Sequence, residues 1–159
     1  MNKEPPIVNA EPKPMDLIRA WAESGYSIGF TNGCFDLIHP GHISLLHRAK
    51  NECDKLVVGL NSDSSVAKLK GKDRPIQKEN ARATVLSALK DVDAVIIFNE
   101  ETPIKLIELI KPDVLIKGGD YKIGEIVGAE FIQQNGGRVV LSDYKNGHST
   151  SEIIKKIER

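Results

Sequence analysis

The sequence predicts a single-domain, doubly wound α/β fold built on a five-stranded parallel sheet. Strand-like and helix-like segments alternate along the chain, and the strand-like runs, such as KLVVGL, are continuously apolar and rich in β-branched residues. Strands of this kind are buried on both faces and pair in parallel through right-handed crossovers. The 159 residues are ample for one domain with a sizeable core.

The elements are expected in the following order. Residues 1–14 carry four prolines, which block regular hydrogen bonding, so we expect a flexible arm there and the domain over residues 15–159. Leu17, Ile18 and Trp21 share one face of a predicted helix over 15–23, before a first strand over 27–31. A helix over 41–51 leads to the apolar strand 55–60.

The second half continues the alternation. The expected elements are a helix over 77–89, a strand over 94–98, a helix from Pro103 to Pro112, a strand over 114–117, a helix over 125–134, a strand over 138–141 and a helix over 149–157. Proline suits a first helical turn and cannot continue a helix, which sets both ends of the fourth helix. The run Asn135-Gly136-Gly137 closes the fifth.

Composition excludes several classes of protein. Lysine plus arginine (22) balance aspartate plus glutamate (22), which argues against a nucleic-acid or membrane-surface partner. No apolar run approaches the ~20 residues of a membrane span. Cys34 and Cys53 have no paired cysteine or histidine-rich neighbour, so we expect neither a disulfide nor a protein-held metal site. These features favour the cytoplasm.

The most specific segment is T-N-G-C-F-D-L-I-H-P-G-H, residues 31–42, which follows the first predicted strand. In doubly wound sheets, ligands bind just beyond the carboxyl ends of the strands. His39 and His42 bracket Gly41 at the mouth of a helix, where both imidazoles can donate to phosphate oxygens. Alternatively, His42 merely begins a helix and His39 lies in a loop. The preceding G-C-F-D run favours the catalytic interpretation, whereas His47 is expected to be solvated or packed.

A second candidate phosphate site lies at the start of the last predicted helix. Ser149, Thr150 and Ser151 offer hydroxyl groups and backbone amides where the helix dipole favours an anion. The same residue types are also ordinary helix N-caps. The pairing with the histidine motif favours the phosphate role.

Two further segments follow strands. The stretch 61–82 carries Lys68, Lys70, Lys72, Arg74 and Arg82, which form either a solvated basic face or part of the ligand edge. The run K-G-G-D-Y, residues 117–121, is either a glycine-rich turn or a place where the backbone approaches a ligand. Lys117 and Asp120 are its candidate side chains.

The histidine segment resembles the H-x-G-H signature of the nucleotidyltransferase superfamily. The runs F-T-N-G-C-F-D-L-I-H-P-G-H, L-N-S-D, L-K-G, R-P-I, K-G-G-D-Y and G-H-S-T-S together resemble the heptose-1-phosphate adenylyltransferase domains of ADP-heptose synthesis, over about residues 25–159. The resemblance implies a Rossmann-like, HUP-type fold. It also implies transfer from ATP to D-glycero-β-D-manno-heptose 1-phosphate, giving ADP-heptose and pyrophosphate for lipopolysaccharide or another surface heptose glycan. His148 departs from the small residue or cysteine usual before Ser-Thr.

The resemblance also implies roles for particular residues. His39, His42 and Lys70 are expected to be catalytic, and Asp36, Asn61 and Asp63 to bind the sugar phosphate. The expected nucleotide-binding residues are Thr31, Asn32, Gly33, Cys34, Phe35, Gly41, Arg82, Lys117, Gly118, Asp120, Ser149, Thr150 and Ser151. Mg²⁺ is expected to bind mainly through the phosphates of ATP.

Relatives often carry a sugar kinase ahead of this domain, but only the short arm and one helix precede the first strand here. We therefore expect a stand-alone form that depends on a separate heptose kinase, and we expect a homo-oligomer. The closest rival is a glycerol-3-phosphate-type cytidylyltransferase, whose R-T-x-G-I-S-T run is replaced here by Y-K-N-G-H-S-T. A non-catalytic nucleotide-sensing module is the third alternative, and the intact histidine and Ser-Thr motifs argue against it.

Overall fold

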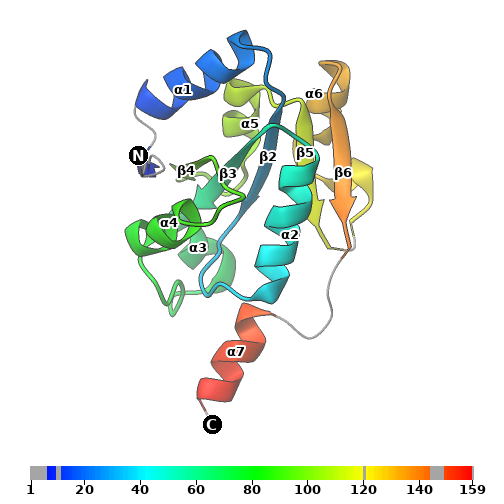
Figure 1. Cartoon of the computed structure of the whole chain (residues 1–159). Helices are drawn as coiled ribbons and strands as arrows, with labels where there is room; N and C mark the ends of the chain where they lie inside the picture. Colours follow the sequence, from blue (N-terminus) through cyan, green and yellow to red (C-terminus); the bar gives the residue numbers. More distant parts are fainter. Residues whose placement is uncertain (1–6, 10–11, 120, 144–148, 159) are drawn as a thin grey trace.

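The computed structural model describes residues 7–9, 12–119, 121–143 and 149–158. Its centre is one sheet of six strands in the order β1-β4-β3-β2-β5-β6, with every neighbouring pair parallel (Figure 1). The strands are β1 (Ile7–Asn9), β2 (Ile28–Gly33), β3 (Lys55–Asn61), β4 (Ala94–Phe98), β5 (Val114–Gly118) and β6 (Arg138–Ser142). The doubly wound parallel fold is thus confirmed, with β2 to β6 as its five predicted strands.

The N-terminal segment differs from the expectation of an arm over 1–14. Ile7–Asn9 pair with Val95, Ile96 and Ile97 of β4 and add a sixth, edge strand to the sheet. Helix α1 spans Pro12–Glu23 and so begins three residues earlier than predicted. Proline at the start of a helix costs little, because the first N–H groups have no partner within the helix. The rest of the predicted arm lies outside the described residues.

Helices cover both faces of the sheet. Helices α1, α5 (Ile104–Ile110) and α6 (Ala129–Gln134) pack on one face around Phe30, Val57 and Leu115. Helices α2 (Pro40–Asn51) and α4 (Glu79–Ser87) pack on the other around Leu56, Val58 and Ile116. Burial of both faces explains why the strands read as uninterrupted apolar runs. The other helical segments described are α3 (Asp63–Lys70), the 3₁₀ turn η1 (Ile123–Glu125) and α7 (Thr150–Ile157).

Two helical segments differ from the sequence expectation. The basic stretch after β3 contains helix α3, which begins where the Ser62 hydroxyl accepts a hydrogen bond from the N–H of Ser65 at 3.2 Å. The helix expected over 125–134 is divided into η1 and α6. Gly128, with φ +88° between them, takes a left-handed conformation that interrupts the helix.

The strand order fixes the place of a ligand site. From β2 the chain moves outward through β3 to β4, and it then returns to the other side of β2 to form β5 and β6. The order of strands therefore reverses between β2 and β5. In folds of this kind the crevice beyond the carboxyl ends of these two strands binds ligands.

Candidate active site

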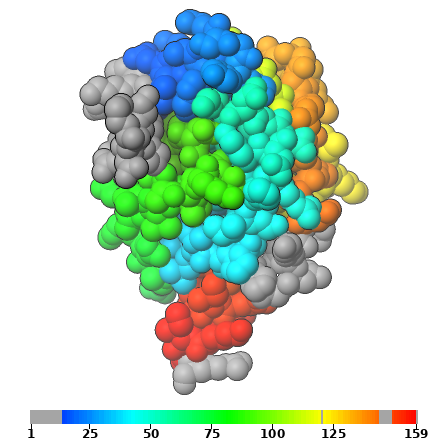
Figure 2. Space-filling view, viewed as in Figure 1, coloured from blue at the N-terminus to red at the C-terminus, as the bar shows by residue number. Residues whose placement is uncertain are grey.

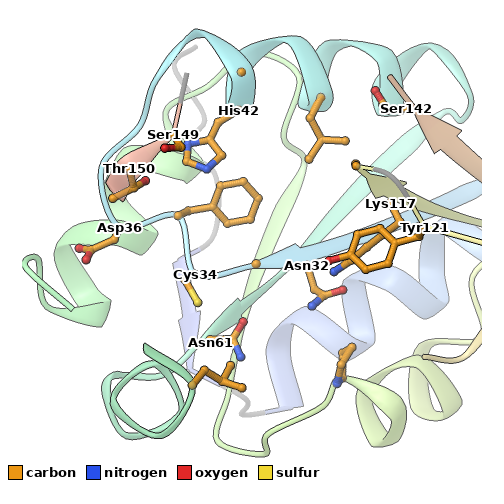
Figure 3. Close-up of a pocket in the computed structure, with 18 of the residues that line it drawn as sticks. Asn32, Cys34, Asp36, His42, Asn61, Lys117, Tyr121, Ser142, Ser149 and Thr150 are labelled. Atoms are coloured by element: carbon orange, nitrogen blue, oxygen red, sulfur yellow. The ribbon is translucent and has the colours of Figure 1, made fainter. Parts of the chain in front are cut away.

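A cavity of about 650 Å³ opens at this crevice. Its lining comes from the end of each strand from β2 to β6 or from the segment just after it, including Asn61 at the end of β3, Thr102 after β4 and Ser142 at the end of β6. Figure 3 shows His42, Ser149 and Thr150 towards one end of the cavity, and Lys117 and Tyr121 towards the other. The volume falls in the ~300–1,000 Å³ range of small-molecule sites.

His39 and His42 lie together at the N-terminus of α2, and both line the cavity. Their rings stack with centroids 3.8 Å apart. The N–H of Gly41 donates to Nδ1 of His39 at 3.1 Å, so neutral His39 carries its proton on Nε2. His39 is therefore the N-cap of α2, and its ring lines the cavity. The helix N-terminus and two imidazoles form a site suited to an anion.

The turn before α2 sets the position of His42. Phe35 has φ +45°, a left-handed conformation that is uncommon for a residue with a side chain. Its ring contacts the ring of His42 with centroids 5.0 Å apart. Nδ1 of His42 is buried and has no hydrogen-bond partner among the described residues. Burial, with a smaller contribution from His39, lowers the pKa of His42 to about 4.

This low pKa predicts a pH-dependent stability. Between pH 6.5, the ordinary pKa of histidine, and about 4, the unfolded chain binds a proton at His42 that the folded protein does not. Above pH 6.5 His42 is neutral in both states, and it does not reduce the free energy of unfolding. As the pH falls from 6.5 to about 4, protonation of the unfolded chain lowers that free energy. Urea unfolding from pH 7 to pH 4 should show a shallower loss in His42→Gln than in the wild type. Equal slopes would contradict a buried, neutral His42.

Arg82 and Asp63 do not line the cavity. The Arg82 side chain is fully buried, and its guanidinium donates to the carbonyl oxygens of Gln77, Cys34 and Asn61 and to Oδ1 of Asp63, at 2.7–2.9 Å. Four hydrogen bonds thus tie the ends of β2 and β3 to α4. The structure gives these two residues a scaffold contact where the sequence suggested ligand binding.

Asp36 and Asn61 lie at the cavity wall, yet their side chains already have partners. The Asp36 carboxylate accepts hydrogen bonds from Nε of Arg74 and from the N–H groups of Ile76 and Gln77, at 2.8–2.9 Å. The amide of Asn61 donates to the hydroxyl of Ser65 at 2.9 Å. Both side chains therefore stabilise the segments that form the cavity wall.

The start of α7 lies at the cavity, as its motif suggested. Ser149, Thr150 and Ser151 line it. The Ser149 hydroxyl accepts from the N–H of Glu152 at 3.1 Å, and the Thr150 hydroxyl donates to the carbonyl of Leu37 at 3.2 Å. Ser149 is thus an N-cap, while the Thr150 contact ties α7 to the turn before α2. The rest of α7 extends away from the domain (Figures 1 and 2).

Two lysines of the predicted site line the cavity from different elements. Lys70 is exposed in the last turn of α3, and Lys117 is half-buried at the end of β5 with its Nζ 5.7 Å from the Tyr121 ring centroid. Burial lowers the pKa of Lys117, and the nearby Cys34 partly opposes this effect. Asp120, the other candidate of that segment, lies outside the described residues.

The cavity brings together most of the predicted residues and adds others. Asn32, Gly33, Cys34, Phe35, Gly41 and Gly118 line it as expected. Thr31 does not, because its side chain is buried within β2. Arg74 of the basic stretch and Tyr121 of the K-G-G-D-Y run also line it, although neither was assigned a role of its own. The lining residues that sequence reasoning missed include Glu101, Thr102, Pro103, Ile126, Val127, Ser142 and Asp143. Several of them directly follow β4 or β6, and the rule that ligands bind at strand ends could have identified these.

The part of the chain that the structure describes offers neither a cluster of metal ligands nor a membrane-spanning helix. Within the described ranges, no group of three or more histidine, cysteine, aspartate or glutamate side chains is arranged to hold a metal ion. None of the helices in the described part of the chain is both long and apolar enough to cross a membrane.

Comparison with curated proteins gives close relatives. The bifunctional protein HldE of Paramagnetospirillum magneticum is 57% identical over 142 residues, which are 89% of this chain and 29% of the relative. The bifunctional protein HldE of Rhodospirillum rubrum is 54% identical over 151 residues, 95% of this chain and 30% of the relative. The chain thus spans less than a third of the length of these relatives.

Solved structures and a family profile agree with this similarity. The lipopolysaccharide core biosynthesis protein from Thermoplasma volcanium has a TM-score of 0.60 at 31% identity, covering 76% of this chain and 98% of that protein. Pantoate-beta-alanine ligase from Francisella tularensis, at 20% identity and a TM-score of 0.58 over 86% of this chain and 67% of the ligase, shares the fold. Residues 30–156 match the profile described as cytidylyltransferase-like, and they include both histidines and the start of α7. The chain therefore belongs to the cytidylyltransferase-like family of nucleotidyltransferases.

Proposed function

We propose that this domain transfers the AMP part of ATP to D-glycero-β-D-manno-heptose 1-phosphate, releasing pyrophosphate. The observation that carries the proposal is the stacked pair His39 and His42 at a helix N-terminus, facing a cavity that the start of α7 also lines. Two imidazoles and two helix N-termini supply hydrogen-bond donors for a polyphosphate. The proposed reaction does not use a protein carboxylate as nucleophile or general base.

The proposed reaction is a single displacement at the α-phosphorus. A phosphate oxygen of the sugar phosphate attacks, a new P–O bond forms, and the bond to the β-phosphate breaks so that pyrophosphate leaves with the electron pair. Because the attacking phosphate is already an anion, no general base is required. Catalysis then depends on alignment of the reactants and on donors directed at the developing charge.

The two histidines have distinct parts in this scheme. Nδ1 of His39 accepts from the backbone, which leaves Nε2–H as the group that can donate to a phosphate oxygen. His42 is neutral at pH 7 in the free protein, and a neighbouring polyphosphate would favour its protonated form. Both would thus strengthen their contacts as negative charge develops at the α-phosphorus.

Mg²⁺ fits this site as part of the substrate. We propose that it enters on the phosphate oxygens of ATP, since Mg²⁺ usually keeps several waters and few protein ligands. It would supply charge neutralisation of the polyphosphate. Lys70, exposed at the cavity edge, would add a positive charge from the protein.

The choice of ATP and a heptose rests on similarity. High identity to bifunctional HldE proteins and similarity to a lipopolysaccharide core biosynthesis protein support a sugar nucleotide product. We further propose that the domain acts in the cytoplasm as a homo-oligomer, on a sugar 1-phosphate made by a kinase. A cytidylyltransferase acting on glycerol 3-phosphate is the alternative.

A substrate panel tests this proposal. ATP, CTP, GTP and UTP are each combined with heptose 1-phosphate, glucose 1-phosphate and glycerol 3-phosphate, and pyrophosphate release is measured. We expect ATP with the heptose 1-phosphate to give the highest kcat/KM. Preference for CTP with glycerol 3-phosphate would assign the domain to the alternative, and nucleotide binding without turnover in any pair would indicate a sensing module.

A further inference from the structure

The segment between α3 and α4, residues 71–78, contributes an arginine to the cavity that the motifs do not assign. Arg74 lines the cavity, and its side chain is 16% exposed. Lys72 of the same segment is exposed and does not line the cavity. Arg74 and Lys72 are two residues apart in the sequence, but only Arg74 lines the cavity.

A buried carboxylate holds Arg74 in place. Nε of Arg74 donates to Oδ2 of Asp36 at 2.9 Å, and the Asp36 side chain is only 1% exposed. Burial raises the pKa of Asp36, but hydrogen bonds from Gln77, Ile76 and Arg74 outweigh it and hold the pKa below its usual value. Asp36 is thus a fixed anion. Among the described residues the terminal nitrogens Nη1 and Nη2 of Arg74 have no hydrogen-bond partner and remain available to a ligand.

The backbone beside Arg74 is held as well. The N–H of Gln77 donates to Oδ1 of Asp36, and the carbonyl of Gln77 accepts from Nε of Arg82. Since Arg82 also donates to the carbonyl of Cys34, the loop is attached to the turn that precedes α2. A side chain on a backbone fixed in this way loses little freedom when it binds a ligand.

Arg74 belongs to the end of the cavity where α7 begins. Asp36, its partner, adjoins Leu37, whose carbonyl accepts from the Thr150 hydroxyl. In Figure 3, Asp36 and Thr150 lie on the same side of the cavity, away from Lys117. The guanidinium therefore shares this end with the hydroxyl groups of the α7 N-terminus.

We propose that Arg74, positioned by Asp36, binds the β- and γ-phosphates of ATP and stabilises the pyrophosphate as it leaves. The inference rests on the proposed function for the identity of the ligand. Arginine offers two parallel N–H donors that match two phosphate oxygens. This assigns to Arg74 the polyphosphate contact that the sequence suggested for Arg82.

Nucleotide binding tests the inference without turnover. Titration calorimetry with ATP and with AMP, in the presence of Mg²⁺, is compared for wild type, Arg74→Ala, Arg74→Lys and the control Lys72→Ala. Loss of a charge-assisted contact should weaken ATP binding by Arg74→Ala about 10- to 100-fold and leave AMP binding nearly unchanged. Arg74→Lys should fall between, since lysine keeps the charge but not the paired donors. Lys72→Ala should bind ATP like the wild type.

If Arg74→Ala weakens ATP binding and AMP binding equally, Arg74 only maintains the shape of the cavity, and the proposed phosphate contact is wrong. The contact is also wrong if Arg74→Ala binds ATP as tightly as Lys72→Ala does. If Arg74→Ala does not fold, the ratio of ATP to AMP affinity in Arg74→Lys decides in the same way. Pyrophosphate release by the wild type tests the proposed function separately, so the two can fail independently.

Discussion

His42→Ala should lower turnover about 10²- to 10³-fold while the protein remains folded. The imidazole lies at the N-terminus of α2, lines the cavity and stacks on His39. In the proposed reaction it would donate to an oxygen of the transferred phosphoryl group as charge develops there. Because the interaction strengthens in the transition state, kcat should fall more than the apparent affinity for ATP. Steady-state kinetics with each substrate varied, together with a thermal melt, measures both effects.

The chain offers a matched control and a way to separate two roles. His47 is exposed on the same helix, pairs with Asp91 at 3.1 Å and does not line the cavity, so His47→Ala should keep near-normal turnover. His39→Asn retains an N-cap acceptor but removes the imidazole donor, and should lose turnover with little loss of stability. Near-normal turnover of a folded His42→Ala would refute the assignment.

Arg82→Ala should destabilise the protein by about 3–5 kcal/mol. The side chain is fully buried, and its loss removes the donors that satisfy the carbonyl groups of Gln77, Cys34 and Asn61 and the carboxylate of Asp63. Buried acceptors without partners are costly, and here they lie at the ends of two central strands. Urea unfolding at pH 7 gives the free energy directly.

An exposed ion pair provides the comparison. Arg48 donates to Asp143 at 3.0 Å, with 45% and 90% of the two side chains exposed, so Arg48→Ala should cost only about 0–1 kcal/mol. A folded Arg82→Ala with unchanged unfolding free energy but weakened ATP binding would restore the ligand-contact role suggested by the sequence. That result would contradict the scaffold assignment.

The sheet was the most predictable part of the fold. Strands buried on both faces must be apolar throughout. Runs such as 55–60 and 94–98 can therefore be recognised as strands from the sequence alone, without knowing which strands they pair with. The helix at Asp63–Lys70 was missed because its charged and polar residues also suit a loop, although Ser62 before it is a good N-cap. The sixth strand depends on pairing with β4, which Ile7–Asn9 alone do not indicate.

The site was predictable only where backbone and motif act together. His39 and His42 lie in the turn after β2 and in the first turn of α2. Because a strand followed by a helix is readily predicted, their place at the sheet edge could be predicted too. The role of an arginine depends instead on what surrounds it in space. Arg74 and Arg82 lie on one basic stretch, yet one lines the cavity and the other is buried among carbonyl groups. Residue type and spacing do not distinguish these two environments.

We propose that this domain breaks the bond between the α- and β-phosphates of ATP and joins AMP to a heptose 1-phosphate. Parallel reactions with ATP labelled at the α- or the γ-phosphorus, heptose 1-phosphate and Mg²⁺ test it most directly. We predict that α-label appears in a nucleotide sugar, that γ-label appears in pyrophosphate, and that both require the heptose 1-phosphate. Gamma-label on the sugar, or release of orthophosphate in place of pyrophosphate, would contradict the claim.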